Sequence, residues 1–425
     1  MSRLIEFAPN RDSRRGAKLL VGVVTVSAVA LAAHVPARAA ISTTYSVTCG
    51  TEVVCSDGRL QAAIAASSNG DIVLVYPGIY REHINFDGRL IRVKSADGPT
   101  VTAIDGAGTS TVVTFDTGES RLSILQGFTV EGGSASGILI EGGASPTIRA
   151  NIVTNNSNCF GGAGISVTTG APLITADTIS ANVGGHALGC GGYLAGGGID
   201  VFYSTATITG NRITDNTMDA GSGIAVDGGA VTIANNVIED NSNDGQSGAS
   251  GLELFNSGAG TSVVQNLIAN NNGTGAFSSV VRFATLGAVS FTDNTVVSTT
   301  ESYAVWINGS SAPPSLINNI IDGGTTPLEC AATYSVDPYI SHDDVYGTTA
   351  PTGACAQLVL GHSNIRVAPR FVNASALIYR EQTSSPTVDA GEFADAEHPF
   401  VLPYTDLAGK PRINENRVDM GAYQR

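Results

Sequence analysis

Residues 198–229 read GIDVFYSTATITGNRITDNTMDAGSGIAVDGG and contain one complete copy of the unit that decides the fold. The unit opens with glycine and two alternating apolar residues, and a short apolar stretch, ATITG (206–210), follows. It closes with an asparagine-led strand, NRITDN (211–216), before the opening recurs as GIAVDGG (223–229). Three short strands joined by tight turns cannot bury an apolar face alone. The unit therefore predicts a coil that stacks on its neighbours in a solenoid.

Copies of this unit recur through the centre of the chain at a spacing of roughly 25 to 34 residues, as in repeat proteins. Stacked coils are expected to share an Ile/Val core at the strand spacing of about 4.8 Å. The polar residues that lead the closing strands fall at equivalent corners and are expected to hydrogen-bond along the stack. These residues are Asn151, Asp177, Asn211, Asn236, Asn266, Asn294 and Asn319.

The composition is that of an all-β chain with little helix. Glycine accounts for 51 of the 425 residues, and only 14% of the residues are charged. The one amphipathic helix that the pattern predicts is LQAAIAAS (60–67), which is expected to cover the open N-terminal end of the stack.

Residues 1–39 have the pattern of a signal peptide. A basic stretch containing Arg14 and Arg15 precedes the apolar run LLVGVVTVSAVALAA (19–33), and Ala37-Arg38-Ala39 fits a cleavage site. The mature protein is expected to be secreted, to the extracellular space, the cell surface or the periplasm, without a transmembrane segment. An uncleaved anchor is the alternative, and both the Sec and the twin-arginine routes stay open.

The formal net charge is −15, and removal of residues 1–39 leaves 16 basic and 35 acidic side chains, a net charge of −19. Such a surface repels nucleic acid and anionic membranes, so neither is expected as a partner. It also repels uronate polysaccharides unless a cation or a basic patch intervenes. We expect a monomer.

The six cysteines fall into three plausible pairs. An even number of cysteines in an exported protein indicates disulfides. The expected pairs are Cys49 with Cys55, Cys159 with Cys190, and Cys330 with Cys355.

The repeat resembles that of the right-handed parallel β-helix, or pectin-lyase-like, superfamily. GDIVLVYPGIYREHINFDG (70–88) resembles the first coil of its bacterial secreted members, and the resemblance covers about residues 56–322. It implies an all-β chain, a single-stranded right-handed parallel β-helix with an N-terminal helical cap and an irregular C-terminal cap. The expected division is a signal peptide (1–39), an N-terminal cap (40–70), the β-helix (71–322) and a C-terminal segment (323–425).

The C-terminal segment resembles the choice-of-anchor Q domain. The matching motifs are FVN (371–373), SSPTVDAG (384–391), DLAGKPR (406–412) and RVDMGAY (417–423). Their charged residues are expected to hold loops together by charge-assisted hydrogen bonds and not to act in catalysis. These residues are Asp389, Asp406, Arg412, Arg417 and Asp419.

The resemblance also implies where chemistry would lie, because enzymes of the superfamily bind polysaccharide along the outer face of one parallel sheet. In the G-I-x-V strands the Ile and Val point inward, so the residues that alternate with them point outward. These outward positions form a stripe of carboxylates, one arginine and aromatic rings. Its members are Asp200, Asp227, Glu253, Arg282, Phe202, Phe255 and Trp306.

This stripe predicts a carbohydrate site. Asp200, Asp227 and Glu253 are the acid/base candidates, and Arg282 is a candidate for stabilising charge. Neighbouring coils would hold the carboxylates roughly 5 to 9 Å apart, which overlaps both separations used in glycoside hydrolysis. The remaining candidates are rings and loop residues that would contact the sugar: Phe202, Phe255 and Trp306 on the strands, and His186 and Tyr193 in the long loop 182–197.

Two alternatives to glycoside hydrolysis stay open. The acids are also compatible with a lyase, in which they would hold Ca²⁺ as cofactor and Arg282 would act as base. They also fit a solvated sheet face with no chemistry. The two functional hypotheses are accordingly a secreted protein that binds and cleaves a polysaccharide, and a non-catalytic cell-surface or matrix protein that binds a glycan for adhesion.

Overall fold

The computed structural model describes residues 42–50, 53–190, 195–245, 247–275, 277–284, 287–308, 312, 314–331, 337–394 and 400–425. The signal-peptide prediction and Tyr193 lie outside these residues. Ser42–Arg425 form one compact unit. Within the described ranges, none of the helices has the length and hydropathy needed to cross a membrane.

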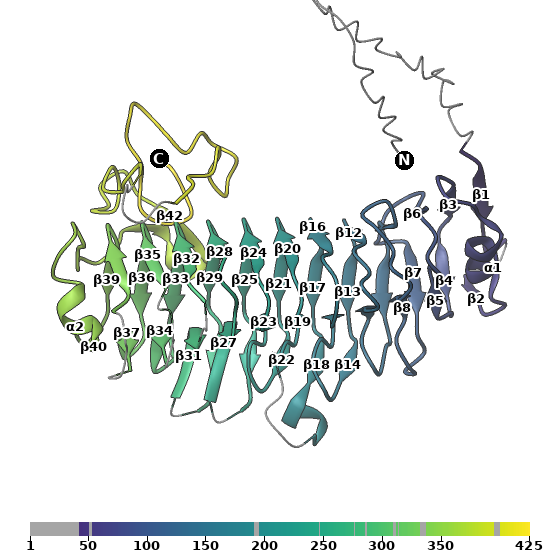
Figure 1. Ribbon diagram of the computed structural model, residues 1–425, viewed down its shortest axis with the longest axis horizontal. Coiled ribbons are helices and arrows are strands. Elements are labelled where there is room, and N and C mark those ends of the chain that lie inside the picture. The colour runs from purple at the N-terminus through teal and green to yellow at the C-terminus, as the bar shows by residue number, and fades with distance from the viewer. Residues whose placement is uncertain are drawn as a thin grey trace, which may run out of the picture. The chain divides into compact units, whose positions relative to one another are not determined.

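The chain winds into a solenoid whose turns are bounded by three long parallel sheets (Figure 1), which confirms the predicted architecture. Sheet A has 12 strands. They are β1 (Thr44–Val47), β3 (Ile72–Val75), β6 (Arg92–Ser95), β9 (Ile124–Gln126), β12 (Thr147–Arg149), β16 (Leu173–Thr175), β20 (Ala206–Thr209), β24 (Val231–Ala234), β28 (Thr261–Val264), β32 (Val289–Thr292), β35 (Ser315–Ile317) and β38 (Tyr339–Ser341).

Sheet B also has 12 strands and follows sheet A around each turn. They are β2 (Val54–Cys55), β4 (Gly78–Tyr80), β7 (Thr102–Asp105), β10 (Thr129–Glu131), β13 (Ile152–Thr154), β17 (Thr178–Ser180), β21 (Arg212–Thr214), β25 (Val237–Glu239), β29 (Leu267–Ala269), β33 (Thr295–Ser298), β36 (Ile320–Gly323) and β39 (Asp344–Tyr346).

Sheet C has 11 strands and contains the predicted stripe. They are β5 (Ile84–Asn85), β8 (Val113–Phe115), β11 (Ile138–Ile140), β15 (Ile165–Val167), β19 (Ile199–Phe202), β23 (Ile224–Asp227), β27 (Ser247–Phe255), β31 (Phe277–Ala284), β34 (Tyr303–Ile307), β37 (Thr326–Cys330) and β40 (Thr352–Gly353). All three sheets continue beyond residue 322, where the sequence repeat fades.

A short five-stranded sheet, sheet D, lies between sheets B and C along the chain in the central turns. Its strands are β14 (Ser157–Asn158), β18 (Val183–Gly184), β22 (Thr217–Met218), β26 (Ser242–Asn243) and β30 (Asn272–Gly273). The loops that leave sheet D lead directly into the sheet C strands that carry the candidate site.

The core is a continuous column of branched aliphatic side chains. Ile199 and Val201 of β19 are fully buried, as are Ile224 and Val226 of β23. Corresponding side chains of every turn belong to one hydrophobic cluster. Removal of this apolar area from water, at about 25 cal/mol per Å², is the main stabilising term for such a stack.

The predicted corner ladder is present and runs in one direction. At each step the backbone N–H, and where the residue is asparagine also the side-chain Nδ2, donates to the Oδ1 of the next turn at 2.6 to 3.1 Å. It continues beyond Asn319 to Asp343. A second ladder, which we did not predict, follows five residues after the first and contains Asn156, Asn182, Asn216, Asn241 and Asn271.

Helix α1 (Arg59–Ala66) covers the N-terminal edge of sheet C. The Gln61 side chain bonds to both backbone groups of Asn85 in β5, so it replaces a missing neighbouring strand. Glu82 accepts hydrogen bonds from Leu60 N and Gln61 N, which satisfies donors at the start of the helix.

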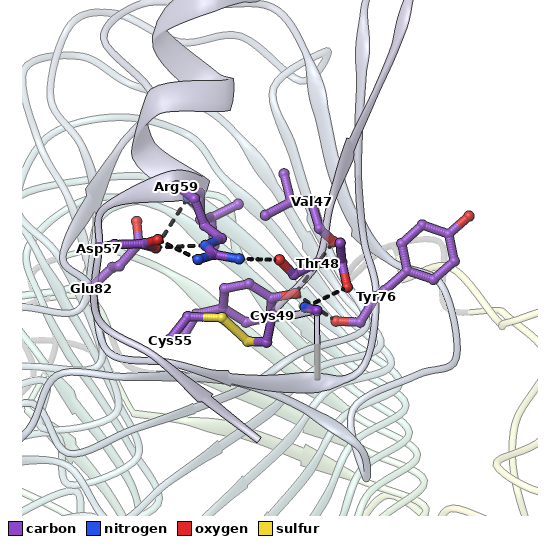
Figure 2. Close-up of a disulfide and its surroundings, with 11 residues drawn as sticks. Val47, Thr48, Cys49, Cys55, Asp57, Arg59, Tyr76 and Glu82 are labelled. Atoms are coloured by element: carbon purple, nitrogen blue, oxygen red, sulfur yellow. Dashed lines mark hydrogen bonds and ion pairs between the residues drawn. A yellow bond between two sulfur atoms is a disulfide. The ribbon is translucent and has the colours of Figure 1, made fainter. Parts of the chain in front are cut away.

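The Cys49–Cys55 disulfide closes the loop before this helix (Figure 2). Arg59 reaches across that loop and bonds to Asp57 and to the carbonyl oxygen of Thr48. The other two predicted disulfides, Cys159–Cys190 and Cys330–Cys355, are also present. All three pairings were therefore predicted correctly.

The segment after β40 contains α2 (Cys355–Leu358), β41 (Phe371–Asn373), the 3-10 helix η2 (Ala374–Ala376) and β42 (Ile378–Glu381). The part of this segment from β41 onward packs on the outer face of sheet B and does not only cap the C-terminal end of the stack. Phe371, Tyr379 and Met420 form a second hydrophobic cluster with side chains of β29, β33 and β36.

The charged residues of this segment hold its loops together, as predicted. Arg412 is fully buried and its Nη2 lies 2.7 Å from Asp293 Oδ1 at the turn between β32 and β33. Asp406 accepts bonds from three backbone N–H groups, and Asp419 accepts from two. Arg417 pairs with Asp389 at 2.6 Å.

Candidate functional site

The outward stripe of sheet C exists with the predicted register. Asp200 pairs with Ala225, Ala225 with Glu253, Glu253 with Arg282, and Arg282 with Trp306. A second column beside it pairs Phe202 with Asp227 and Asp227 with Phe255. Alternation along each strand sends Ile199 and Val201 into the core and their neighbours outward.

Five of the predicted residues line one pocket on the outer face of sheet C. The pocket has a volume of about 120 Å³ and spans β19, β23 and β27. Its walls combine carboxylates with aromatic rings. The lining residues are Phe160, Ala195, Asp200, Phe202, Ala225, Val226, Asp227, Glu253 and Phe255.

Asp200 is crowded by backbone, and two glycines make this approach sterically acceptable. A Cβ on Gly161 would lie 3.1 Å from Asp200 Oδ2, and one on Gly196 would lie 2.5 Å from Asp200 Cβ. Both glycines have positive φ, +123° and +80°. Loss of hydration, with the nearby charge of Asp227, raises the pKa of Asp200 to about 8. Asp200 therefore carries a proton at neutral pH.

Asp227 lies on the next strand, in the second column. It is half-buried, and Asn256 Nδ2 donates a 3.1 Å hydrogen bond to its Oδ1. The rings of Phe202 and Phe255 occupy the paired positions on either side. Both rings are partly exposed, so they present apolar faces to the pocket on either side of this carboxylate.

Glu253 is buried and held by two donors. Its Oε1 lies 3.1 Å from Arg282 Nη1, and its Oε2 accepts a 2.7 Å bond from Ala249 N. A carboxylate fixed in this way is suited to shaping the pocket floor and to orienting Arg282.

Arg282 and Trp306 continue the stripe beyond the pocket. The Arg282 guanidinium carbon lies 4.9 Å from the centre of the Trp306 ring, within cation–π range. Two more rings lie beside Trp306. Phe277 is 6.1 Å away at an interplanar angle of 22°, and Tyr303 is 5.6 Å away at 28°.

His186 lies in the 3-10 helix η1 (Gly185–Leu188) after sheet D, away from the residues that line the pocket. Its Nδ1 lies 2.8 Å from Asp219 Oδ1, and this bond raises the pKa of the imidazole. Burial, together with a bond to Asp219, also raises the pKa of Asp244 in the next loop. The structure therefore places His186 in a separate loop cluster.

Sequence reasoning missed Phe160 and Asn256 as residues of the site. Phe160 is 86% exposed and belongs to a loop that the Cys159–Cys190 disulfide ties to the loop before β19. The cysteine next to it was the available signal. Among the described residues, no group of three or more His, Cys, Asp or Glu side chains is arranged to hold a metal ion.

Comparison with known proteins supports the fold. A family model described as "Right handed beta helix region" matches residues 191–321. No curated protein sequence matches the chain. Among solved structures, pectate lyase Pel9A is 16% identical with a TM-score of 0.48, covering 91% of this chain and 98% of its own. The structure of XylC with xylose is 10% identical with a TM-score of 0.50, covering 89% and 98%. The chain is a right-handed parallel β-helix, as predicted.

Proposed function

We propose that this protein binds a neutral polysaccharide along the outer face of sheet C and hydrolyses it at the pocket between β19 and β27. The observation that carries the proposal is the pair Asp200 and Asp227. Asp200 keeps a proton at neutral pH, and Asp227 lies on the adjacent strand of the same pocket. Two carboxyl groups in different environments are the requirement for glycoside hydrolysis.

In this mechanism Asp200 donates its proton to the glycosidic oxygen as the bond from that oxygen to the anomeric carbon breaks. The oxygen of a water molecule bonds to the anomeric carbon, and Asp227 assists by accepting the proton that the water loses. Phe202 and Phe255 hold the sugar faces on either side. Glu253 forms part of the pocket floor, and its ion pair with Arg282 holds it in place.

The charge of the pocket favours a neutral sugar over a uronate. Among its described lining residues there are three carboxyl side chains and no Lys or Arg. The nearest stripe cation, Arg282, is paired with Glu253. A uronate would meet like charge here, and elimination from a uronate needs a cation beside its carboxylate. Hydrolysis therefore fits the pocket better than the lyase reaction.

We further propose that the protein acts outside the cytoplasm. Three disulfides favour an oxidising compartment, and the pattern of residues 1–39 fits export. The resemblance of residues 371–423 to the choice-of-anchor Q domain suggests attachment at the cell surface. A chain processed at residue 39 and recovered from the cell envelope would agree with this proposal.

The test is a reducing-end assay on neutral and uronate polysaccharides, with and without calcium. Asp200→Asn and Asp227→Asn should each lower kcat by at least about 100-fold, the usual range for acid/base groups. Asp97→Asn, an exposed acid in a distant turn, is the control.

The activity of the wild-type protein should also decline as the pH rises through about 8, because Asp200 loses its proton there. Cleavage that Asp200→Asn leaves unchanged would contradict the mechanism. Binding of a neutral glycan without cleavage would leave the adhesion hypothesis in its place.

A further inference from the structure

Three aromatic rings gather on sheet C beyond the pocket. The rings of Phe277 of β31 and Tyr303 of β34 lie within 22° and 28° of the plane of the Trp306 ring, also of β34. Phe277 is 54% exposed, and the other two rings are half-buried. An exposed phenyl ring is apolar surface, and its removal from water by a ligand is favourable. This group of rings therefore presents an apolar face that a ligand could cover.

The position of these rings is fixed relative to the pocket by strand register. Trp306 belongs to the same outward column as Asp200, and β34 is separated from β23 by three strand steps. At about 4.8 Å per step, Tyr303 and Trp306 lie roughly 14 Å from the Asp227 strand, and Phe277, on β31, lies roughly 10 Å from it. A sugar unit in an extended chain is about as long as one such step.

The surface between the two places suits a bound sugar chain. Glu253 and Arg282 occupy the intervening column positions, and their charges are paired with each other. Arg282 also contacts the Trp306 ring, so the guanidinium fixes that ring in place. The Arg282 side chain is 12% exposed, so it can donate hydrogen bonds to sugar hydroxyl groups while buried Glu253 balances its charge.

We propose that Phe277, Tyr303 and Trp306 form a second sugar-binding subsite, which stacks on a sugar about three to four units from the bond that is cleaved in the pocket. This inference rests on the proposed function. It makes binding and cleavage depend on the length of the sugar chain, because a short oligosaccharide bound in the pocket cannot reach the rings.

The experiment uses ladders of two to eight units of cello-, xylo- and manno-oligosaccharides. For the ladder that is cleaved, kcat/KM should rise up to about five or six units and then level off. Phe277→Ala and Trp306→Ala should lose this rise, roughly tenfold for long chains. Dimers and trimers should change less than about twofold. Trp306→Phe should recover part of the loss, and Tyr404→Ala, which removes an exposed ring of the C-terminal segment, should have no effect.

Binding of the same ladders to Asp200→Asn separates this inference from the proposed function. Chain-length-dependent binding that Phe277→Ala weakens would support the subsite even if the wild-type protein cleaves nothing. If the affinity of Asp200→Asn rises with chain length equally whether or not Phe277→Ala is added, the subsite is overturned and the hydrolase proposal stays intact. Failure of the wild-type protein to bind any ladder would overturn both.

Discussion

Asp177 occupies a ladder position where its neighbours are asparagines. Its Oδ1 accepts from Asn151 N and Nδ2, as the equivalent atoms do elsewhere in the ladder. Where an asparagine would present Nδ2 as a donor, Asp177 presents Oδ2, which is buried and has no partner. Burial raises the pKa of Asp177 to about 7 despite its bonds to Asn151. A proton on Oδ2 supplies the missing donor below that pH.

Replacement of Asp177 by asparagine should therefore stabilise the protein in a pH-dependent way. A folded-state pKa raised from 3.8 to about 7 means that the wild type loses stability as the pH rises between these values. Asp177→Asn removes that loss. We expect its Tm to exceed that of the wild type by roughly 2–5 °C at pH 8.5, with a much smaller difference at pH 5. The Tm of the wild type, of Asp177→Asn and of the control Asp97→Asn is measured at both pH values. A Tm difference between Asp177→Asn and the wild type that is the same at pH 5 and pH 8.5 would contradict this account.

Arg412 and Asp293 form an ion pair that is fully removed from water. Loss of one partner leaves an uncompensated buried charge, so Arg412→Met should lower the free energy of unfolding by about 3–5 kcal/mol. The exposed pair of Arg417 and Asp389 is the matched comparison, and Arg417→Ala should lower the free energy of unfolding far less, because water screens that pair. Urea unfolding measures both. The double variant Arg412→Met with Asp293→Leu should recover part of the stability lost in Arg412→Met. If Arg412→Met and Arg417→Ala lower the free energy of unfolding equally, burial does not distinguish the two ion pairs.

The Cys159–Cys190 disulfide holds the loop that supplies the aromatic wall of the pocket. Phe160 and Gly161 follow Cys159 directly, and Gly161 lies against Asp200. The Cys330–Cys355 disulfide is a suitable control because the two close loops of similar length, 31 and 25 residues.

In the chain-entropy model each of these two disulfides contributes about 3.5 kcal/mol of stability. Replacement of either pair by serine should therefore lower stability by a similar amount. Only the Cys159→Ser, Cys190→Ser variant should also lose activity, by about tenfold in kcat/KM measured well below its Tm. Equal activity in the two serine variants would show that the tether does not shape the pocket.

The strands, the first ladder and the outward stripe could be predicted because each depends on local periodicity. Ile and Val alternate with the stripe residues, so the direction of Asp200 follows from Ile199 and Val201 alone. The second ladder also had a signal in the sequence, an asparagine five residues after a residue of the first ladder in five successive turns. The position of the C-terminal segment on sheet B had none, since its contacts join residues far apart, such as Arg412 and Asp293. The partner of His186 depends on loop geometry, which periodicity does not determine.

Across the whole molecule, burial raises the pKa of several carboxyl groups far above its usual range. The pKa is about 6 for Asp322, about 7 for Asp344, and about 8 for Asp343 and Glu381, in addition to Asp177 and Asp200. In each case loss of hydration is the main cause. Some carboxyl groups of this protein, whose formal net charge is −15, therefore stay protonated at neutral pH.

The fold should accordingly be most stable in mildly acidic solution. Each of these groups binds a proton in the folded state at a pH where the unfolded chain has lost it, so stability falls as the pH rises from about 4 toward 8. We expect the Tm to drop by about 5 °C or more between pH 5 and pH 9. A calorimetric Tm that is constant or rises over this range would show that these carboxyl groups are ionised in the folded protein.

The pairing of Arg412 with Asp293 also has a consequence for how the chain is made. The ladder bonds join residues at most 34 positions apart, so each turn can complete them as soon as the next turn has formed. The contact between Arg412 and Asp293 spans 119 positions, and the one between Gln265 and Thr405 spans 140. A chain that ends at residue 400 would hold folded turns, an apolar flank that lacks Leu407 and Met420, and a buried aspartate without its arginine. Proteases that remove unfinished chains would find such a chain easy to attack, which limited proteolysis of a chain ended at residue 400 can measure.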